Sequence, residues 1–254
     1  MRPQDPAALV NAGVYLVDKP AGCTSFAVAS RVRRLLHIKK VGHAGTLDPF
    51  ATGLLIVCAG REATRHMARF MSGEKHYAAR LKLGVTTDTL DTEGRVVAEM
   101  PVPALDMATI RACLSGLTGD IMQTPPAFSA LKHEGKPLYR YAREGVIIEK
   151  PARPVHIALL EALAWNEAAR ELDIAVRCGP GTYVRTLAAD IGAGLGTCAH
   201  LVALRRLASG HFRADEALPG EALFAEDEGE ARAALIAVRM DVEVALRRAE
   251  TATG

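Results

Sequence analysis

Strand-like and helix-like segments alternate along this chain, and the loops between them are too irregular for a series of βαβ units. Buried strands are predicted at residues 13–17 and at 54–59, where apolar residues follow one another without interruption. Between them, apolar residues at helical spacing predict a helix capped by Thr24 or Ser25. The chain has no glycine-rich phosphate motif such as GxxxxGKS/T, which argues against a nucleotide-cofactor enzyme.

The middle and the end of the chain continue this mixed pattern. Apolar and polar residues alternate cleanly over 75–83, so we expect a half-buried strand with Tyr77 on its apolar side. Further strands are predicted near 155–164 and 171–178. Helical spacing predicts helices over 106–117, 137–144, 182–193, 200–207 and 230–248.

Composition limits the class of protein. A length of 254 residues suits one large domain or a domain with an appendage, and 49% hydrophobic with 24% charged residues is ordinary globular usage. No apolar run approaches the roughly 18 residues of a membrane span, and no signal-peptide core follows the first residues, so we expect a cytoplasmic protein. The five cysteines lack CxxC spacing, which favours reduced small hydrophobes over a disulfide framework or a zinc site.

Charge is distributed unevenly. Residues 215–230 contain seven acids and no Lys or Arg, so the rest of the chain is basic although the net charge is only +2. A basic body with a detachable acidic strip suits a polyanionic partner such as RNA, whereas the alternative is an ordinary solvated surface. The two most basic stretches contain Arg31, Arg33, Arg34, Lys39 and Lys40, and Lys132, Lys136, Arg140, Arg143, Lys150 and Arg153.

The most unusual loop spans residues 42–53, which contain three glycines and one proline between predicted core elements. Asp48 lies there between Leu47 and Pro49, an arrangement that by itself is more typical of a turn than of a catalytic carboxylate. Together with Lys19-Pro20, the sequence Gly45-x-Leu47-Asp48-Pro49-x-Ala51-Thr52-Gly53 resembles the signature of the TruB family of tRNA pseudouridine-55 synthases.

Further motifs extend the resemblance from about residue 13 to 213. They occur in the order and at the spacing of the family. They are Lys75-x-Tyr77, Gly84-x-Thr86-Thr87-Asp88-Thr89-x-Asp91-x-x-Gly94, Pro125-x-x-Ser129-Ala130-Leu131-Lys132, Gly181-Thr182-Tyr183-Val184-Arg185-Thr186, Ala199-His200-Leu201 and Leu204-Arg205-Arg206.

The resemblance implies an α+β fold, the pseudouridine synthase catalytic fold, in which helices and long loops flank a central mixed and mostly antiparallel sheet. We therefore expect a single catalytic domain over 1–254, with an RNA-clasping insertion at about 124–153 and an acidic, helical tail at about 214–254. Many family members carry a C-terminal PUA module, and no complete PUA domain is expected here.

The activity implied by the resemblance is the isomerisation of uridine to pseudouridine at position 55 in the TΨC loop of tRNA. Nothing is oxidised and no group is gained, so neither a cofactor nor a metal is expected. Asp48 corresponds to the carboxylate nucleophile. The sequence leaves open whether this carboxylate attacks the sugar, attacks the base or assists elimination to a glycal.

The resemblance also assigns the remaining site residues, each of which could otherwise be a core or surface residue. The cation that pairs with the nucleophile corresponds to Arg185, and the residue that stacks on uracil and relays its proton corresponds to Tyr77. The base must be flipped out of the RNA to react. The family's histidine that occupies the vacated space corresponds to His43. The remaining substrate-binding residues are Tyr183, Asp91, Leu204 beneath the base, Lys19 and Lys132.

The expected partner is tRNA, through its T stem-loop, bound by a monomeric protein without metal or membrane. Two other activities remain open at this stage. A tRNA-folding helper would use the basic surfaces and not need Asp48, and an N-glycosidase would release free uracil.

Overall fold

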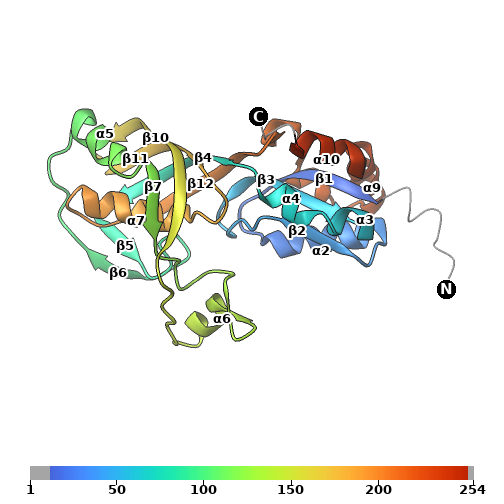
Figure 1. The fold of residues 1–254 in the computed structure, drawn as a ribbon, viewed down its shortest axis with the longest axis horizontal. Coiled ribbons are helices and arrows are strands. Elements are labelled where there is room, and N and C mark those ends of the chain that lie inside the picture. The colour runs from blue at the N-terminus through green and yellow to red at the C-terminus, as the bar shows by residue number, and fades with distance from the viewer. Residues whose placement is uncertain (1–11, 251–254) are drawn as a thin grey trace. The chain divides into compact units, whose positions relative to one another are not determined.

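The computed structural model of the chain describes residues 12–250. The described chain divides into two compact units. Residues up to His76 together with those from Arg205 onward form the first unit, and Tyr77–Leu204 form the second. Both units contain strands and helices, as the ribbon in Figure 1 shows, so the predicted α+β class is confirmed.

The first unit contains a mixed sheet with the strand order β14-β1-β3-β12. β1 is parallel to β14 and antiparallel to β3, and the end of β12 is parallel to β3. The elements of this unit are β1 (Gly13–Lys19), α2 (Ser25–Leu36), β2 (Val41–Ala44), β3 (Thr52–Ala59), α3 (Arg61–Thr64), α4 (Met67–Met71), the end of β12 (Ala199–Ser209), β13 (Phe212–Arg213), the 3-10 helix η1 (Ala214–Glu216), β14 (Leu218–Pro219), α8 (Gly220–Leu223), α9 (Glu228–Ala237) and α10 (Val242–Glu250).

The core of this unit has two layers because helices cover both faces of β1 and β3. Tyr15 and Leu55 point to the layer that contains α2 and α9, whereas Leu16 and Ile56 point to the layer that contains α4 and α10. A strand buried on both faces needs apolar residues at every position. The uninterrupted run at 54–59 therefore reflects its central position.

Helix α2 begins as predicted, and Thr24 is its cap. The Thr24 hydroxyl accepts a hydrogen bond from the backbone nitrogen of Ala27 at 3.0 Å. Arg31, which belongs to one of the two most basic stretches of the sequence, is buried on this helix. The Arg31 guanidinium forms an ion pair with Glu228 at 2.6 Å and donates to two backbone oxygens, of Leu223 and Ala225.

The second unit contains strands in the order β4-β11-β10-β7, with β10 antiparallel to both of its neighbours. Helix α5 packs against β10, and its cap is Asp106, as predicted. The elements of this unit are β4 (Lys75–Leu83), β5 (Val85–Thr87), β6 (Val96–Glu99), α5 (Met107–Ser115), β7 (Gly119–Gln123), β8 (Lys132–His133), β9 (Lys136–Pro137), α6 (Leu138–Arg143), β10 (Arg153–Asn166), β11 (Glu171–Cys178), α7 (Val184–Gly194) and the start of β12.

The predicted insertion contains one small hairpin, β8–β9, followed by the predicted helix α6. In Figure 1 this segment stands away from the strands of its own unit. Its aromatic and basic side chains contact one another, since the Lys136 ammonium lies 4.4 Å from the centre of the Tyr141 ring and forms an ion pair with Glu144.

Two predicted helices are wrong. Residues 200–207 belong to strand β12, in which Leu204, Arg206 and Ala208 are buried on alternate positions. This alternation was hidden because one inward-facing residue is an arginine. The helix predicted over 230–248 is two helices, α9 and α10, because Met240 leaves helical geometry to exchange two backbone hydrogen bonds with Val14.

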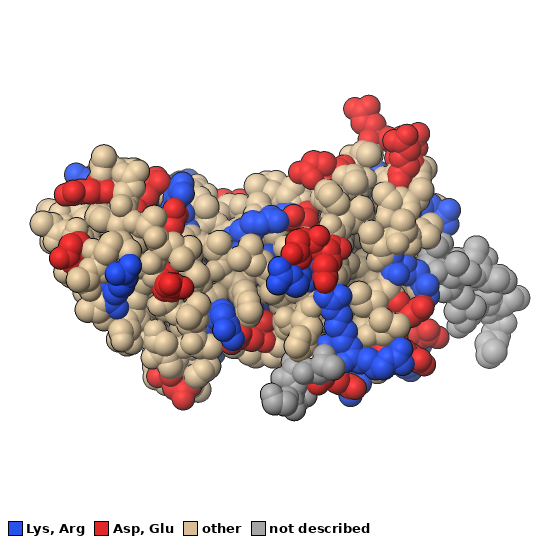
Figure 2. Space-filling view, turned by 90° about the horizontal axis from the view of Figure 1, so that it is seen from above, with Lys and Arg blue, Asp and Glu red and all other residues tan. Residues whose placement is uncertain are grey.

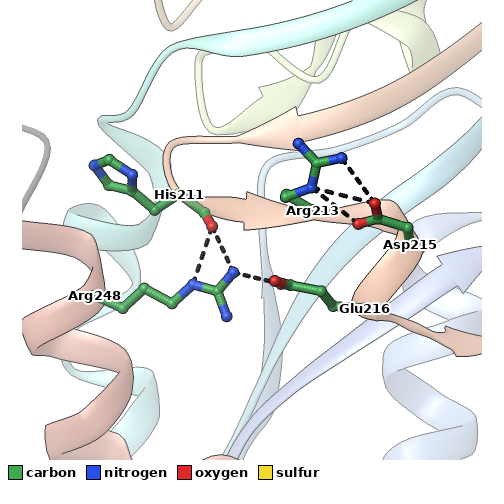
Figure 3. Close-up of polar contacts among 5 residues, drawn as sticks. All are labelled: His211, Arg213, Asp215, Glu216 and Arg248. Carbon is green, nitrogen blue, oxygen red and sulfur yellow. Dashed lines mark hydrogen bonds and ion pairs between the residues drawn. The ribbon is translucent and has the colours of Figure 1, made fainter.

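The acidic strip is not a detachable segment. It forms η1, β14 and α8, and several of its carboxylates are paired with arginines of the same unit. Figure 3 shows Arg213 bonded to Asp215, with a shortest distance of 2.7 Å, and Arg248 bridging Glu216 and the backbone oxygen of His211. On the face drawn in Figure 2, Lys and Arg side chains are interspersed with Asp and Glu side chains.

The five cysteines are all free thiols, and Cys58 and Cys178 are buried. Burial raises the pKa of the Cys58 thiol to about 12, which keeps it protonated and unreactive. Over residues 12–250, no helix has the length and apolar character needed to cross a membrane.

The contact between α2 and the acidic strip gives a first prediction. Glu228→Gln removes the carboxylate that faces the buried Arg31, so we expect the free energy of unfolding to fall by about 1–2 kcal/mol. Chemical denaturation of both proteins measures this. Asp215→Asn is the control, because both members of that pair are exposed and no measurable loss is expected. Equal stability of wild type and Glu228→Gln would contradict the prediction.

Candidate active site

Asp48 lies on a short loop between β2 and β3, which we call the Asp48 loop and define as residues 45–51. The loop begins at Gly45, whose φ of 94° is in the region that favours glycine. Asp48 is half-buried, and its backbone oxygen accepts a hydrogen bond from Ala51. The carboxylate is thus carried on a tight turn whose neighbours Leu47 and Ala51 are buried.

A buried lysine stabilises the loop from one side. Lys19 is fully buried at the end of β1, and its ammonium donates to the backbone oxygens of Pro20 at 2.8 Å, Cys23 at 2.7 Å and Pro49 at 3.1 Å. The last bond reaches the residue directly after Asp48. Lys19 as a substrate-binding residue stays a prediction, and these contacts favour a role in holding the loop.

A serine stabilises the loop by binding the backbone of Leu47, the residue before Asp48. The hydroxyl of Ser25, the first residue of α2, donates to the backbone oxygen of Leu47 at 3.0 Å and accepts from its nitrogen at 2.9 Å. One side chain thus satisfies both backbone polar groups of the buried residue Leu47. A third residue, Arg206, donates to the backbone oxygens of Gly45 and Thr46.

His43 lies on β2 opposite Val57, two residues before the loop begins. Burial, and then the positive charge of Arg206, lower the pKa of the His43 imidazole, so the ring is neutral at neutral pH. Its Nδ1 is buried and has no hydrogen-bond partner among residues 12–250.

In the second unit, Arg185 and Asp91 form a buried ion pair. Both side chains are only 4% exposed, and Arg185 Nε lies 3.7 Å from an Asp91 oxygen. Arg185 also donates to the backbone oxygens of Thr89 at 2.7 Å and Phe128 at 2.8 Å. The guanidinium therefore connects α7, the loop that follows β5 and the start of the insertion.

Asp91 is held on the other side of this pair. One of its oxygens accepts from the Thr89 hydroxyl at 2.5 Å and from the Glu93 nitrogen at 2.9 Å. These donors fix the orientation of the Asp91 carboxylate, whose position beside Arg185 offsets the cost of burying that guanidinium.

Tyr183 directly precedes α7 and is fixed through its backbone. The buried carboxamide of Gln123 accepts from the Tyr183 nitrogen at 2.7 Å and donates to the Tyr183 oxygen at 3.1 Å. The Arg153 guanidinium lies 5.3 Å from the centre of the half-buried Tyr183 ring, within cation–π range, and donates to the Gly181 oxygen.

The other expected site residues of the second unit lie on different elements. Tyr77 is half-buried on β4, Leu204 is 7% exposed on β12, and Lys132 is exposed on β8 within the insertion. The structure thus groups Lys19 and Asp48 in the first unit, and Asp91 and Arg185 in the second. The expected pairing of Asp48 with Arg185 stays a prediction.

Sequence reasoning missed several residues that hold these groups. Ser25 was considered only as a helix cap, Arg206 was part of a motif without a role, and Gln123 and Arg153 carried no signal for a contact with Tyr183 or its loop. Across residues 12–250, no cluster of His, Cys, Asp and Glu side chains could hold a metal ion.

Comparison with family models decides the assignment. The N-terminal domain model of the TruB family pseudouridylate synthases matches residues 33–184, and the C-terminal domain model of tRNA pseudouridylate synthase B matches residues 185–249. The chain belongs to the TruB family. The resemblance inferred from its motifs is therefore confirmed.

Individual relatives agree with this assignment. A tRNA pseudouridine synthase B of Desulfotalea psychrophila is 54% identical over 222 residues, which are 86% of this chain and 90% of that protein. One of Chromohalobacter salexigens is 50% identical over 203 residues, 80% of this chain and 65% of the relative. A chain in a solved Cbf5–Nop10–Gar1 complex has a TM-score of 0.69 and 26% identity, with coverage of 96% of this chain and 64% of that chain.

The contact between Ser25 and Leu47 gives a second prediction. Ser25→Ala leaves a buried N–H and a buried C=O without their partner, so we expect the free energy of unfolding to fall by about 1–3 kcal/mol. Denaturant titration measures this. Ser30→Ala on the same helix is the matched control, because the buried Ser30 hydroxyl has no hydrogen-bond partner among residues 12–250. A loss as large in Ser30→Ala as in Ser25→Ala would refute this account of the loop.

A third prediction follows from the lowered pKa of His43. The unfolded chain binds a proton near pH 6.5 and the folded chain only at lower pH, so the stabilising contribution of neutral His43 is present above pH 6.5 and is lost on acidification. Below pH 6.5, the free energy of unfolding of wild type is expected to fall, relative to that of His43→Gln, by up to about 1.4 kcal/mol per pH unit. Denaturation between pH 5 and 8 measures this, with His211→Gln in parallel. The prediction would be contradicted if the difference in free energy of unfolding between wild type and His43→Gln did not change with pH.

Proposed function

We propose that this protein isomerises uridine to pseudouridine in tRNA, at position 55 of the TΨC loop, with Asp48 as the nucleophile. Membership of a pseudouridylate synthase family over most of the chain supports the reaction, and the names of the relatives support tRNA as the substrate. The observation that carries the role of Asp48 is its position on a loop fixed on both sides by buried side chains.

The reaction is balanced without an external reagent. The bond from ribose C1′ to N1 of uracil breaks, the ring turns, and a bond from C1′ to C5 forms. The proton on C5 leaves, and N1 gains one. A carboxylate serves this chemistry through attack on the sugar, through attack on the ring, or through assistance to elimination to a glycal, and in every case it must be ionised.

Arg185 is proposed to keep that carboxylate charged. Its guanidinium already has Asp91 on one side and two carbonyl oxygens around it, so its orientation is fixed before any substrate binds. A preorganised cation stabilises negative charge without reorganisation during the reaction. In this proposal Asp91 acts both on Arg185 and on the extruded nucleotide.

The aromatic and apolar residues are proposed to hold the base. Tyr77 stacks on uracil and relays the C5 proton, Tyr183 bounds the pocket, and Leu204 lies beneath the ring. The hydrogen bonds of Gln123 to the Tyr183 backbone support this, because a fixed backbone limits the positions that the ring can take and so lowers the conformational entropy lost on binding.

His43 is proposed to occupy the space left by the flipped uridine. A neutral imidazole is suited to this position because it can stack between bases without the cost of desolvating a charge. Lys132 and the exposed cations of the insertion, with Arg33, Lys39 and Lys40, are proposed to contact the phosphates of the T stem-loop. A monomer in the cytoplasm, where tRNA is modified, completes the proposal.

Conversion of unmodified tRNA tests this function. Asp48→Asn is nearly isosteric but cannot act as a nucleophile, so we expect the rate of pseudouridine formation to fall at least about 10³-fold. Release of tritium from uridine labelled at C5, together with mass mapping of position 55, measures the reaction. Asp215→Asn, which changes an exposed acid of the same unit, is expected to retain wild-type activity.

Three outcomes would overturn the proposal. Free uracil as product would indicate an N-glycosidase, and an Asp48→Asn variant with full activity would remove the nucleophile. Refolding of tRNA by a wild-type protein that forms no pseudouridine would instead identify a folding helper.

A further inference from the structure

Arg206 is a charged residue in the core of the first unit. It is only 2% exposed and is one of the largest fully buried side chains of the described chain. It lies on β12, where its backbone is paired in parallel with Gly53 of β3. A side chain at Gly53 would come within 2.2 Å of the Arg206 oxygen, so only glycine allows the two strands to approach this closely.

The guanidinium of Arg206 binds both ends of the segment that carries Asp48. Its Nη2 donates to the Gly45 oxygen at 3.0 Å and its Nη1 to the Thr46 oxygen at 3.4 Å, both before Asp48. Its Nε donates to the Leu54 oxygen at 2.7 Å, after Asp48. One rigid, planar group thus fixes the distance between the entry and the exit of the loop.

The burial of this charge is not explained by an ion pair. Over residues 12–250, no carboxylate lies within ion-pair distance of the Arg206 guanidinium, whose partners are backbone oxygens. A buried cation without a carboxylate is costly, and an apolar residue of similar volume would suit a core better. The burial of Arg206 is therefore better explained by the backbone oxygens that its guanidinium holds around Asp48 than by a contribution to core stability.

The preceding residue provides an internal contrast. Arg205 points away from the loop, and its side chain is 41% exposed. It forms two hydrogen bonds with the carboxylate of Asp18, at 2.9 and 2.7 Å. The side chains of two adjacent arginines on one strand therefore have different partners, and of these two side chains the one that hydrogen-bonds to residues 45–54 is that of Arg206.

We propose that Arg206 is a positioning residue for the reaction, which sets the place of the Asp48 carboxylate by bridging Gly45, Thr46 and Leu54. The inference rests on the proposed function of Asp48. Displacement of a reacting group by about 1 Å can slow a reaction about 10²-fold, so loss of the bridge should slow the chemical step while tRNA binding remains. Arg206 touches neither substrate nor reacting atoms in this account.

Single-turnover kinetics with enzyme in excess over tRNA test the proposal, because the rate constant at saturation does not depend on the folded fraction of the enzyme. Arg206→Lys keeps the charge but has one nitrogen in place of the three that contact Gly45, Thr46 and Leu54, so we expect the bridge to be lost and the rate constant to fall about 10²-fold. The Kd for tRNA, from filter binding, should change less than about threefold. Arg205→Lys is the matched control and should retain the wild-type rate constant.

A second variant covers loss of folding. Arg206→Gln places a smaller neutral amide in the core and avoids burying an ammonium without partners. The same kinetic measurement is made on Arg206→Gln if Arg206→Lys cannot be purified. A wild-type rate constant in a folded Arg206 variant, or an equal loss in Arg205→Lys, would overturn the inference. So would failure of both Arg206 variants to fold, since Arg206 would then serve the core. An inactive wild type would overturn the proposed function itself.

Discussion

The Asp48 loop of the first unit depends on hydrogen bonds between buried polar side chains and backbone groups. A tight loop cannot satisfy all of its own buried peptide groups, so side chains from other elements must supply hydrogen-bond partners. Lys19, Ser25 and Arg206 supply such partners together, because each binds a backbone group close to Asp48. The turn is thus fixed by side chains from three other elements of the unit.

The second unit uses a different arrangement, in which the cation has an acid partner. Asp91 is fixed by Thr89 and the backbone of Glu93, and it faces Arg185, which also binds two carbonyl oxygens. Arg185 Nε lies 3.7 Å from the nearest Asp91 oxygen, whereas Arg205 forms two direct hydrogen bonds with the Asp18 carboxylate.

Much of the fold could be predicted from local patterns. The strand at 54–59, the alternation at 75–83 and the helix after Thr24 follow directly from residue spacing and capping chemistry. β12 was mistaken for a helix because Arg206 interrupts its apolar alternation, and the break between α9 and α10 depends on backbone pairing of Met240 with Val14. The assignment of Asp48 and Arg185 to the site comes from the motifs and stays a prediction. Ser25 and Gln123 bind partners 22 and 60 residues away, which spacing alone does not reveal.

The alternation of β12 has a consequence for how this family of chains can diverge. Leu204 and Arg206 face one side of the strand and Arg205 faces the other, so the register of a few residues decides which arginine enters the core. Gain or loss of a single residue upstream in the strand would exchange the two arginines and place Leu204 on the opposite face. An insertion or deletion within this strand would therefore remove the hydrogen bonds by which Arg206 holds the Asp48 loop.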